Sequence, residues 1–199
     1  MAKRLFDIIS SGFGLLVISP LLPVIAVAIK LDSTGPIFYR QPRIGMDRKP
    51  FNILKFRTMT VDADKQGDIS VKSDARITRV GRWLRRLEMD EIPTLINVLI
   101  GDMSVVGPRP ELAVYVQNYS QDQLRVLTVR PGMTDLGTLR YRNETELLDG
   151  ERDPEQVYRE QILPDKLRLN LEYVDRKSFW FDMKIIFETL GMVVKQNKG

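Results

Sequence analysis

The sequence predicts an α/β fold that is mainly helical, with a few short strands and a broken helix at the N-terminus that enters a membrane. Three observations lead to this prediction. The first thirty residues contain a long uncharged run, short apolar segments between Gly and Pro follow it, and apolar side chains at helical spacing recur in the second half. We expect a membrane segment over residues 1–30 and one further domain over residues 31–199, together forming one structural unit.

The composition limits the chemistry that the chain can perform. Thirty Lys and Arg against 26 Asp and Glu give a net charge of +4, and no nucleic-acid-binding motif is recognisable, so we expect no nucleic-acid partner. The absence of Cys excludes disulfides, thiolate catalysis and Cys-ligated zinc. The absence of His removes the usual general base. Any catalysis must therefore use carboxylates, Lys, Arg and hydroxyls, and the expected metal is an oxygen-preferring cation such as Mg²⁺.

The N-terminal run has no charged residue over positions 8–29. Its length is sufficient to cross a hydrocarbon core of about 30 Å as one helix. Lys3 and Arg4 precede it and Lys30 follows it, so the positive-inside rule places both flanks on the cytoplasmic side. A cleaved signal peptide is less favoured, because the run is longer than a usual signal core and contains two prolines.

The middle of this run contains Ser19-Pro20, with Pro23 one turn later. In a continuous helix these prolines would leave the carbonyls of Leu16 and Ser19 without amide donors. The Ser19 hydroxyl can partly satisfy the freed groups, which permits a sharp bend. From the residues alone, two structures remain open: a re-entrant helix-break-helix that returns to the same side, and a kinked helix that spans the membrane.

The central part of the chain is rich in turns. Residues 37–39 and 51–54 are expected to form short strands, and residues 61–75 a polar, mobile loop. Helical patterning starts near Ile77 and resumes after Asp90, with Gly101 as a plausible stop. Residues 108–150 should form turns and a short helix, and residues 154–173 a further helix.

The C-terminal segment predicts an amphipathic helix. Its apolar face is formed by Phe179, Met183, Ile186, Leu190 and Val193. Aromatic residues lie nearby, and positive charge comes from Lys184, Lys195 and Lys198. This combination suits a helix in the headgroup region of a membrane, and it equally suits an ordinary helix packed on a core.

The strongest chemical signal is the segment RRLEMDEIP at positions 85–93. Pro93 belongs in the first turn of a helix, so we expect a helix to begin at about Asp90, with Asp90 at the N-cap and Glu91 in the first turn. Exposed amides and the helix dipole favour anions there and depress carboxylate pKa values. An ionised Asp can attack phosphorus or bind a metal ion. The alternative is a plain capping Asp.

Two further segments supply cations. Arg109 stands between Pro108 and Pro110, and these prolines stiffen the backbone that carries its guanidinium. The planar guanidinium suits phosphate oxygens. The alternative is a rigid surface turn with an incidental Arg, which would have the same sequence pattern. Lys55 and Arg57, on either side of Phe56, offer further basic groups, which a solvated basic loop would also show.

Together these motifs resemble the bacterial sugar transferases, the monotopic polyprenyl-phosphate phosphoglycosyl transferases. The resemblance extends from Lys3 to the C-terminal helix, and the order and spacing of the motifs make it specific. The motifs stand here as KRLFD at 3–7, SP at 19–20, QPRIG at 41–45, KFRTM at 55–59, DEIP at 90–93, GDMSVVGPRPE at 101–111 and RPGMT at 130–134.

The resemblance implies the fold, the place and the reaction. It implies the re-entrant topology with the break at Ser19-Pro20, at the bacterial inner membrane with the catalytic domain in the cytoplasm. It implies that Asp90 attacks the β-phosphate of a UDP-sugar, forms a phosphosugar intermediate and expels UMP, and that polyprenyl phosphate then takes the sugar phosphate. Glu91 would assist, with both carboxylates near Mg²⁺. Arg109, Lys55 and Arg57 would bind phosphate.

The chain also departs from the family pattern. After Arg-Pro-Gly-x-Thr, relatives continue with Gly, an aromatic residue and Ala-Gln, whereas this chain reads DLGTL at 135–139. Many relatives carry an acidic residue near Asn170. These positions belong to the part of the family associated with substrate selection, so they leave the sugar open, whereas the reaction class rests on the intact dyad and Pro-Arg-Pro segment.

We expect the small, single-domain form of the family, without the extra N-terminal membrane domain of longer relatives, and a homodimer is compatible with it. The partners would be a UDP-sugar, undecaprenyl phosphate and the phospholipid bilayer, at the first membrane step of glycoconjugate assembly. A non-catalytic membrane scaffold for glycan assembly is the alternative, and replacement of Asp90 by Asn would leave its activity unchanged. A basic peripheral protein would instead leave membranes at high salt.

Overall fold

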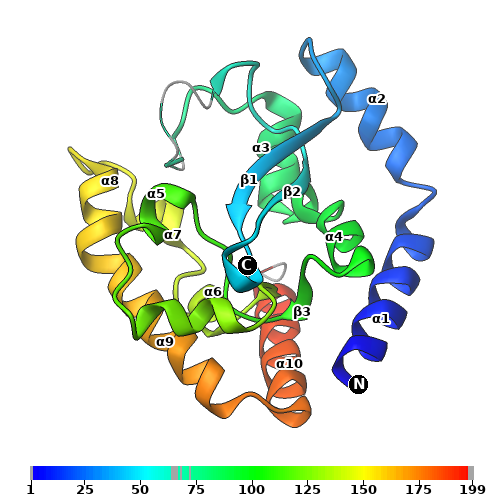
Figure 1. Ribbon diagram of the computed structural model, residues 1–199. Coiled ribbons are helices and arrows are strands. Elements are labelled where there is room, and N and C mark those ends of the chain that lie inside the picture. Colours follow the sequence, from blue (N-terminus) through cyan, green and yellow to red (C-terminus); the bar gives the residue numbers. More distant parts are fainter. Residues whose placement is uncertain (1, 64–66, 68, 72, 197–199) are drawn as a thin grey trace.

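The computed structural model describes residues 2–63, 67, 69–71 and 73–196, with side chains as far as Met192. Helix α1 (Ala2–Ile18) and helix α2 (Leu22–Asp32) run along one side of the molecule, with a bend of 66° between them (Figure 1). The Ser19 hydroxyl donates to the carbonyl of Leu16 at 2.8 Å, as expected from the loss of the amide donor at Pro20. The predicted break at Ser19-Pro20 is confirmed.

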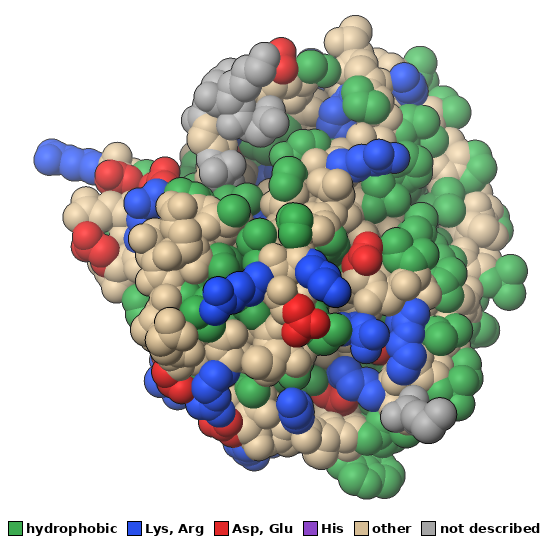
Figure 2. Space-filling model, in the orientation of Figure 1, with side chains coloured by type: hydrophobic (Ala, Val, Ile, Leu, Met, Phe, Trp, Pro, Cys, Tyr) green, Lys and Arg blue, Asp and Glu red, His purple; other side chains and the backbone are tan. Residues whose placement is uncertain are grey.

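The length and composition of these two helices can be compared with those of a membrane-crossing helix. Among the described residues, no single helix is long and apolar enough to cross a membrane, and the bent pair α1–α2 meets that test when its two arms are taken together. Hydrophobic side chains gather along this edge of the molecule (Figure 2). The exposed ones are Leu5, Ile8, Ile9, Phe13, Leu16, Val17, Leu21, Val24, Val27 and Leu31.

The expected short strands form one antiparallel hairpin between the N-terminal helices and the C-terminal half (Figure 1). Strand β1 (Phe38–Ile44) pairs with strand β2 (Pro50–Phe56), so that Phe38 lies opposite Phe56 and Ile44 opposite Pro50. A 3₁₀ turn, η1 (Met46–Arg48), closes the hairpin. Phe56 is buried with residues of α2 and α3, which fixes the end of β2 that carries Lys55.

Several described residues of the loop after β2 are held by the guanidinium of Arg76. Arg76 donates hydrogen bonds to the carbonyls of Ala63, Gly67 and Ile69, each at 2.8 Å, and forms an ion pair with Asp74 at 2.6 Å. The segment 61–75 is a loop in its described residues, as expected, and these contacts give it a defined path. Positions 64–66, 68 and 72 lie outside the described residues.

Two helices flank the predicted dyad. Helix α3 (Arg79–Arg86) begins at Thr78, whose hydroxyl accepts the amide of Gly81 at 3.0 Å, close to the predicted start at Ile77. Helix α4 (Thr94–Ile100) ends at Gly101, which has a φ of 99°, so the predicted stop is confirmed. The predicted start at about Asp90 is wrong, because a separate 3₁₀ turn, η3 (Met89–Glu91), precedes α4.

A second small sheet lies next to α1. Strands β3 (Ser104–Val106) and β4 (Gly132–Thr134) are parallel, and α5 (Ala113–Val116) and a 3₁₀ turn, η4 (Gln123–Thr128), connect them. The two strands approach so closely that a Cβ on Gly132 would lie 2.1 Å from the amide nitrogen of Gly107. Only glycine fits there.

The C-terminal half is helical. Its elements are α6 (Leu136–Arg140), α7 (Glu144–Leu147), α8 (Pro154–Val157), η5 (Tyr158–Ile162), α9 (Leu163–Arg176) and α10 (Phe179–Gln196). The helix predicted over 154–173 therefore begins as expected and continues to Arg176. It contains one π turn, η5, directly before Pro164, because proline lacks the amide that a regular turn needs.

Helix α10 has a buried side and an exposed side. Ile185 is fully buried and Asp182 nearly so, whereas Trp180, Phe187 and Leu190 are exposed. The helix is thus packed on the core and also presents aromatic side chains outward, so it combines features of both predicted structures. The side chains of Val193 and Lys195, and all of Lys198, lie outside the described residues.

Candidate active site

The Asp90–Glu91 pair lies in a tight turn between two helices. Glu88 adopts left-handed backbone angles (φ 55°), which ends the path of α3. The amide of Ile92 then donates to the carbonyl of Met89 at 3.2 Å, which closes the 3₁₀ turn. Because Pro93 offers no amide, the regular helix starts only at Thr94. The two carboxylates therefore stand on a turn in front of α4.

Glu91 is the carboxylate to which the predicted cations converge. Its Oε1 accepts a hydrogen bond from Lys55 Nζ at 2.8 Å and from Arg109 Nη2 at 2.5 Å. Burial alone would raise the pKa of Glu91, but the charges of Arg109 and Lys55 outweigh it and hold this pKa well below its usual range. Glu91 is thus ionised, and three residues from distant parts of the sequence form one cluster.

Asp90 has a different environment on the same turn. Among the described residues, no Lys or Arg nitrogen lies within ion-pair distance of its carboxylate. Burial, together with the negative charge of Glu91, raises the pKa of Asp90, although Lys55 and Arg85 partly oppose this. The expected depression by a helix terminus is therefore wrong for Asp90, because no regular helix starts there. The result is a carboxylate with no direct counter-charge.

The position of Lys55 follows from the docking of α4 on the free edge of β2. The Asn97 side chain accepts the amide of Leu54 at 2.9 Å and donates to the carbonyl of Asn52 at 2.8 Å. The Thr94 hydroxyl donates to the carbonyl of Leu54 at 3.0 Å. These bonds satisfy the edge of a two-stranded sheet and hold Lys55 beside the turn that carries Glu91.

Arg109 is held by the strands behind it. The segment that carries it follows β3, where the amide of Gly132 donates to the carbonyl of Pro108 at 3.0 Å. The Arg109 amide donates to the Asp135 carboxylate at 3.0 Å, and Asp135, which is 1% exposed, also caps α6. Asp135 belongs to the DLGTL departure, so this part of the chain supports the backbone of Arg109.

The sequence reasoning missed Arg85. Its Nε donates to the Thr58 hydroxyl at 2.8 Å and its Nη1 to the Ser70 hydroxyl at 2.7 Å. Burial lowers the pKa of Arg85, and the charge of Asp90 opposes this shift, so the guanidinium is within electrostatic range of that carboxylate. A signal was present, because Arg85 is part of the RRLEMDEIP segment, but that segment alone does not show which of its two arginines faces the turn.

Arg57 does not join the cluster. It is 6% exposed, and its Nη2 donates to the carbonyl and the hydroxyl of Ser33, each at 2.9 Å. Strand β2 ends at Phe56, so the alternation that would place Arg57 beside Lys55 stops one residue early. The structure therefore places Arg57 apart from Lys55 and Arg109, where its side chain supports the loop after α2, and its binding of phosphate stays a prediction.

The donor set for a metal ion is small. Among the described residues, no group of three or more acidic side chains could hold one. Asp90 and the Oε2 atom of Glu91 provide carboxylate oxygens on one turn. Mg²⁺ commonly binds through one or two carboxylates plus substrate phosphates and water. The two residues therefore fit Mg²⁺ if a bound diphosphate supplies further oxygens.

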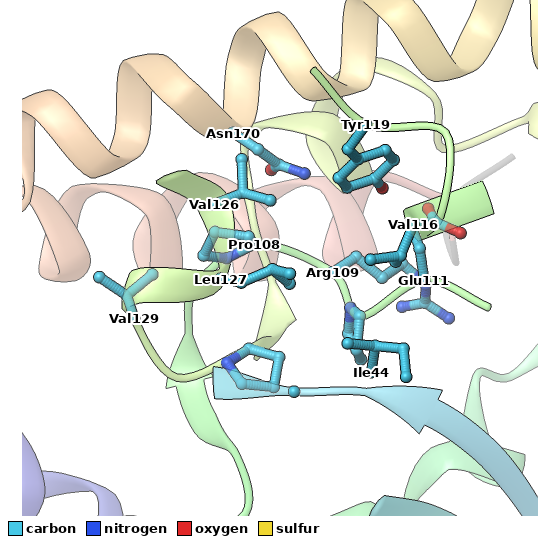
Figure 3. A pocket seen from close by; sticks show the side chains of 13 residues that line it. Ile44, Pro108, Arg109, Glu111, Val116, Tyr119, Val126, Leu127, Val129 and Asn170 are labelled. Atoms are coloured by element: carbon cyan, nitrogen blue, oxygen red, sulfur yellow. The ribbon is translucent and has the colours of Figure 1, made fainter. Parts of the chain in front are cut away.

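A small cavity lies against the Pro-Arg-Pro segment (Figure 3). Its volume is about 10 Å³, which is room for about one water molecule. Asn170 lines it, and the Oδ1 atom of Asn170 is buried without a hydrogen-bond partner in the described part of the chain. This cavity is too small for a nucleotide or a sugar, and it places the second departure from the family pattern close to Arg109.

The chemistry that this arrangement supports is nucleophilic attack on a phosphate. Asp90 offers a desolvated carboxylate, Lys55 and Arg85 place positive charge near it, and Arg109 adds a cation at the neighbouring Glu91. Such charge stabilises the oxygens of a phosphoryl group in its transition state. No His or Cys is needed. Glu91 neutralises part of the positive charge and keeps two of the cations in fixed positions.

Comparison with known proteins identifies the family of this chain. The family model described as "Bacterial sugar transferase" matches residues 1–196. The chain is 40% identical to the UDP-glucose:undecaprenyl-phosphate glucose-1-phosphate transferase of Escherichia coli K12, over 96% of this chain and 39% of that protein. It is 39% identical to the exopolysaccharide production protein PSS of Rhizobium leguminosarum, over 99% of this chain and 97% of that protein. The chain thus spans about two fifths of the length of the first of these relatives.

Proposed function

The chain belongs to the bacterial sugar transferase family, and from its site we propose that it transfers a sugar 1-phosphate from a UDP-sugar to polyprenyl phosphate, with release of UMP. The observation that carries this proposal is the Asp90–Glu91 turn. One carboxylate is ion-paired to Lys55 and Arg109, and its neighbour has no ion pair with a described residue. This asymmetry gives the two acidic residues different roles.

In the first step, a carboxylate oxygen of Asp90 attacks the β-phosphorus of the UDP-sugar. The bond between this phosphorus and the bridging oxygen breaks, and UMP leaves with that oxygen and its electron pair. The sugar phosphate is then held as an acyl phosphate on Asp90. The raised pKa of Asp90 makes its carboxylate more basic than an ordinary one, which favours attack once it is ionised.

In the second step, an oxygen of polyprenyl phosphate attacks the same phosphorus. The bond to Asp90 breaks, and the carboxylate returns with its electron pair. The product is a polyprenyl diphosphate sugar, and no net proton is consumed. Arg109 and Lys55 compensate the negative charge that crosses the site in both steps, because their fixed donors are in place before the reaction.

A divalent cation would complete the site. When bound, Mg²⁺ would neutralise charge on the diphosphate, and Asp90 and Glu91 are the residues that would hold it. Arg85 is fixed by Thr58 and Ser70, so it keeps positive charge near Asp90 without a mobile side chain. Arg109 presents a planar fork to phosphate oxygens.

We further propose that α1 and α2 insert into the cytoplasmic membrane and anchor the protein there. We call this anchoring the membrane seat. The support is the bent pair of apolar helices, with Lys3 and Arg4 at one end and Lys30 at the other. A contiguous apolar surface of this extent is rare on a soluble monomer. A lipid acceptor would then reach Asp90 from the bilayer surface. UDP-glucose is the first donor to test, because relatives that match this chain carry it in their names.

The decisive experiment is UMP release from a panel of UDP-sugars. The full chain is reconstituted with undecaprenyl phosphate and Mg²⁺, and wild type is compared with Asp90→Asn. We expect release that requires one donor, the lipid acceptor and Asp90. A phosphosugar adduct on the wild type, seen by intact-protein mass spectrometry without acceptor, would support the covalent step.

The opposing outcomes are equally specific. Release that persists in Asp90→Asn would remove the proposed nucleophile. Folded wild type that releases no UMP with any donor and forms no adduct would favour the non-catalytic scaffold. Release only when donor and acceptor are both present, with no adduct on the enzyme, would replace the covalent intermediate by direct transfer between the two substrates.

A further inference from the structure

A second group of cations lies outside the candidate active site, at the start of α1. Arg4 donates from Nη1 to the carbonyl of Val98 at 2.6 Å and from Nη2 to the carbonyl of Leu99 at 2.8 Å. Arg130 donates from Nε to the carbonyl of Gly101 at 2.9 Å. Both guanidinium groups therefore converge on the C-terminal end of α4.

These two cations lack a carboxylate partner. In the part of the chain that the structure describes, neither Arg4 nor Arg130 forms an ion pair, and the two Nη groups of Arg130 make no hydrogen bond. Nη2 of Arg4 would lie 3.1 Å from a Cβ on Gly101, the residue whose carbonyl accepts from Arg130. The end of a helix offers only about half a negative charge. An added anion would therefore be stabilised here.

A cavity of about 430 Å³ opens beside them. Its charged lining consists of Lys3, Arg4, Arg130, Lys177, Asp7 and Asp182. Both carboxylates are already engaged within the protein, since Asp182 accepts from Lys3 at 2.7 Å and Asp7 accepts from Ser104 and from the amide of Val105, each at 3.0 Å. The four cations outnumber them, so the cavity has a net positive charge.

The rim of the cavity is apolar on the side of α1 and α10. Phe179 lines it and packs edge-on against Phe6, with ring centroids 5.9 Å apart. The neighbouring Trp180 is 80% exposed, and Leu5 on α1 is 60% exposed. Lys and Arg side chains gather near the start of α1, beside this apolar edge (Figure 2). A ligand with an anionic head and apolar chains matches both surfaces.

We propose that this cavity binds the phosphate group of an anionic phospholipid, with Arg130 and Arg4 as its donors, Lys177 at the rim, and the acyl chains against α1. The inference rests on the proposed membrane seat. The volume of the cavity is sufficient for a glycerophosphate headgroup. Lys3 is fixed by Asp182, whereas Arg130 uses only Nε within the described part of the chain, so its two Nη groups can bind a ligand.

The test measures thermal stability of the full chain in nonionic detergent with added short-chain lipid. Dihexanoyl phosphatidylglycerol should raise the Tm of wild type by about 3 °C or more at ten times its Kd. Dihexanoyl phosphatidylcholine and inorganic phosphate are the comparison ligands. Arg130→Gln should lose at least half of the shift. Lys184→Gln makes the same charge change on exposed α10 outside the cavity, and it should keep the full shift.

Each outcome has a defined meaning. An equal shift with phosphatidylglycerol and phosphatidylcholine, or an equal loss in Arg130→Gln and Lys184→Gln, would overturn the headgroup site. An equal shift with inorganic phosphate would show a free-phosphate site in place of a lipid site. Flotation with neutral vesicles tests the membrane seat separately. If wild type floats with them but shows no preference for the anionic lipid, the seat stands and this inference fails.

Discussion

Two clusters of carboxylates and cations lie on either side of the Pro-Arg-Pro segment. They differ in the partners and in the solvent exposure of their central carboxylate. At Glu91, the carboxylate meets Lys55 and Arg109 and remains 26% exposed in its side chain. At Glu111, two residues after Arg109, the carboxylate accepts the Tyr158 hydroxyl at 2.8 Å and lies 3.8 Å from Arg43. Glu111 is only 9% exposed.

The pKa values of the two carboxylates shift in opposite directions. Burial raises the pKa of Glu111, and Lys166, Arg43 and the Tyr158 hydrogen bond only partly offset this. At Glu91 the cations prevail over burial, and its pKa falls. The same residue types therefore form a closed cluster where an aromatic hydroxyl and the core surround them, and an open, charged cluster where the carboxylate keeps two cations as partners.

The largest expected effect concerns the open cluster. Asp90→Asn should reduce turnover at least about a thousandfold, because the amide is not a nucleophile towards phosphorus. Melting temperature should be unchanged within about 2 °C. UMP release and differential scanning fluorimetry provide the two measurements. Asp175→Asn, an exposed position on α9, is the matched control. A parallel loss of stability would show that Asp90 belongs with the structural carboxylates.

Removal of divalent cations should have the next largest effect. A chelator should lower UMP release by about a hundredfold or more, since two carboxylates and a diphosphate would then repel one another. Added Mg²⁺ should restore the rate, and the Tm should not change. Full activity in excess chelator would mean that no metal ion is needed. Lys55, Arg85 and Arg109 alone would then neutralise the charge of the phosphates.

Arg109 tests whether geometry matters in addition to charge. Arg109→Lys keeps the charge but loses the planar fork, so kcat should fall by about 10- to 100-fold. Steady-state kinetics with the preferred donor measures this, and Arg168→Lys on the exposed face of α9 is the control. An effect confined to KM would assign Arg109 to ground-state binding of the donor.

Lys55 tests the electrostatics of the open cluster through pH. Asp90 must be ionised to attack, so the rate should fall as the pH drops through its raised pKa. Lys55 lowers that pKa, so Lys55→Met should move the acid limb of kcat/KM to higher pH, by about one unit. Lys49→Met, in the turn of the same hairpin, should leave the limb in place. A shift to lower pH would contradict the assigned sign.

The smallest effect on activity should come from the closed cluster. Glu111→Gln keeps an acceptor for Tyr158 and mimics the protonated carboxyl that burial favours, so turnover should change by less than about threefold while stability falls by about 1–2 kcal/mol. Thermal melts and UMP release on the same preparation would measure both. A large loss of turnover at unchanged stability would show that Glu111 also contributes to activity, so the two clusters would not differ in role.

Features with a local cause were predictable from the sequence. The break at Ser19-Pro20 follows from a missing amide, and the stop at Gly101 follows from its freedom to adopt a positive φ. The family resemblance assigned Lys55 and Arg109 to one site, but their ion pairs with Glu91 were not predictable, because residues 36 and 18 positions away cannot be paired by local pattern.

The remaining features depend on tertiary structure. The turn at Asp90 arises because Glu88 adopts a left-handed conformation that few non-glycine residues take. The positions of Arg57 and Arg85 depend on where β2 ends and on which hydroxyls surround the end of α3. The opposite pKa shifts of Asp90 and Glu91 depend on side chains from three other segments, so neither sign was readable from the dyad itself.

The contact between Gly107 and Gly132 makes the two parallel strands a mechanical link. With no side chain between them, backbone touches backbone, and a Cβ on Gly107 would come within 2.4 Å of the Arg130 carbonyl. No flexible side chain lies between the two backbones to accommodate a displacement. A shift of the loop that carries Arg130 must therefore reach the segment that carries Arg109. A displacement at the edge of α1 would in this way be passed to the backbone that carries Arg109, the partner of Glu91.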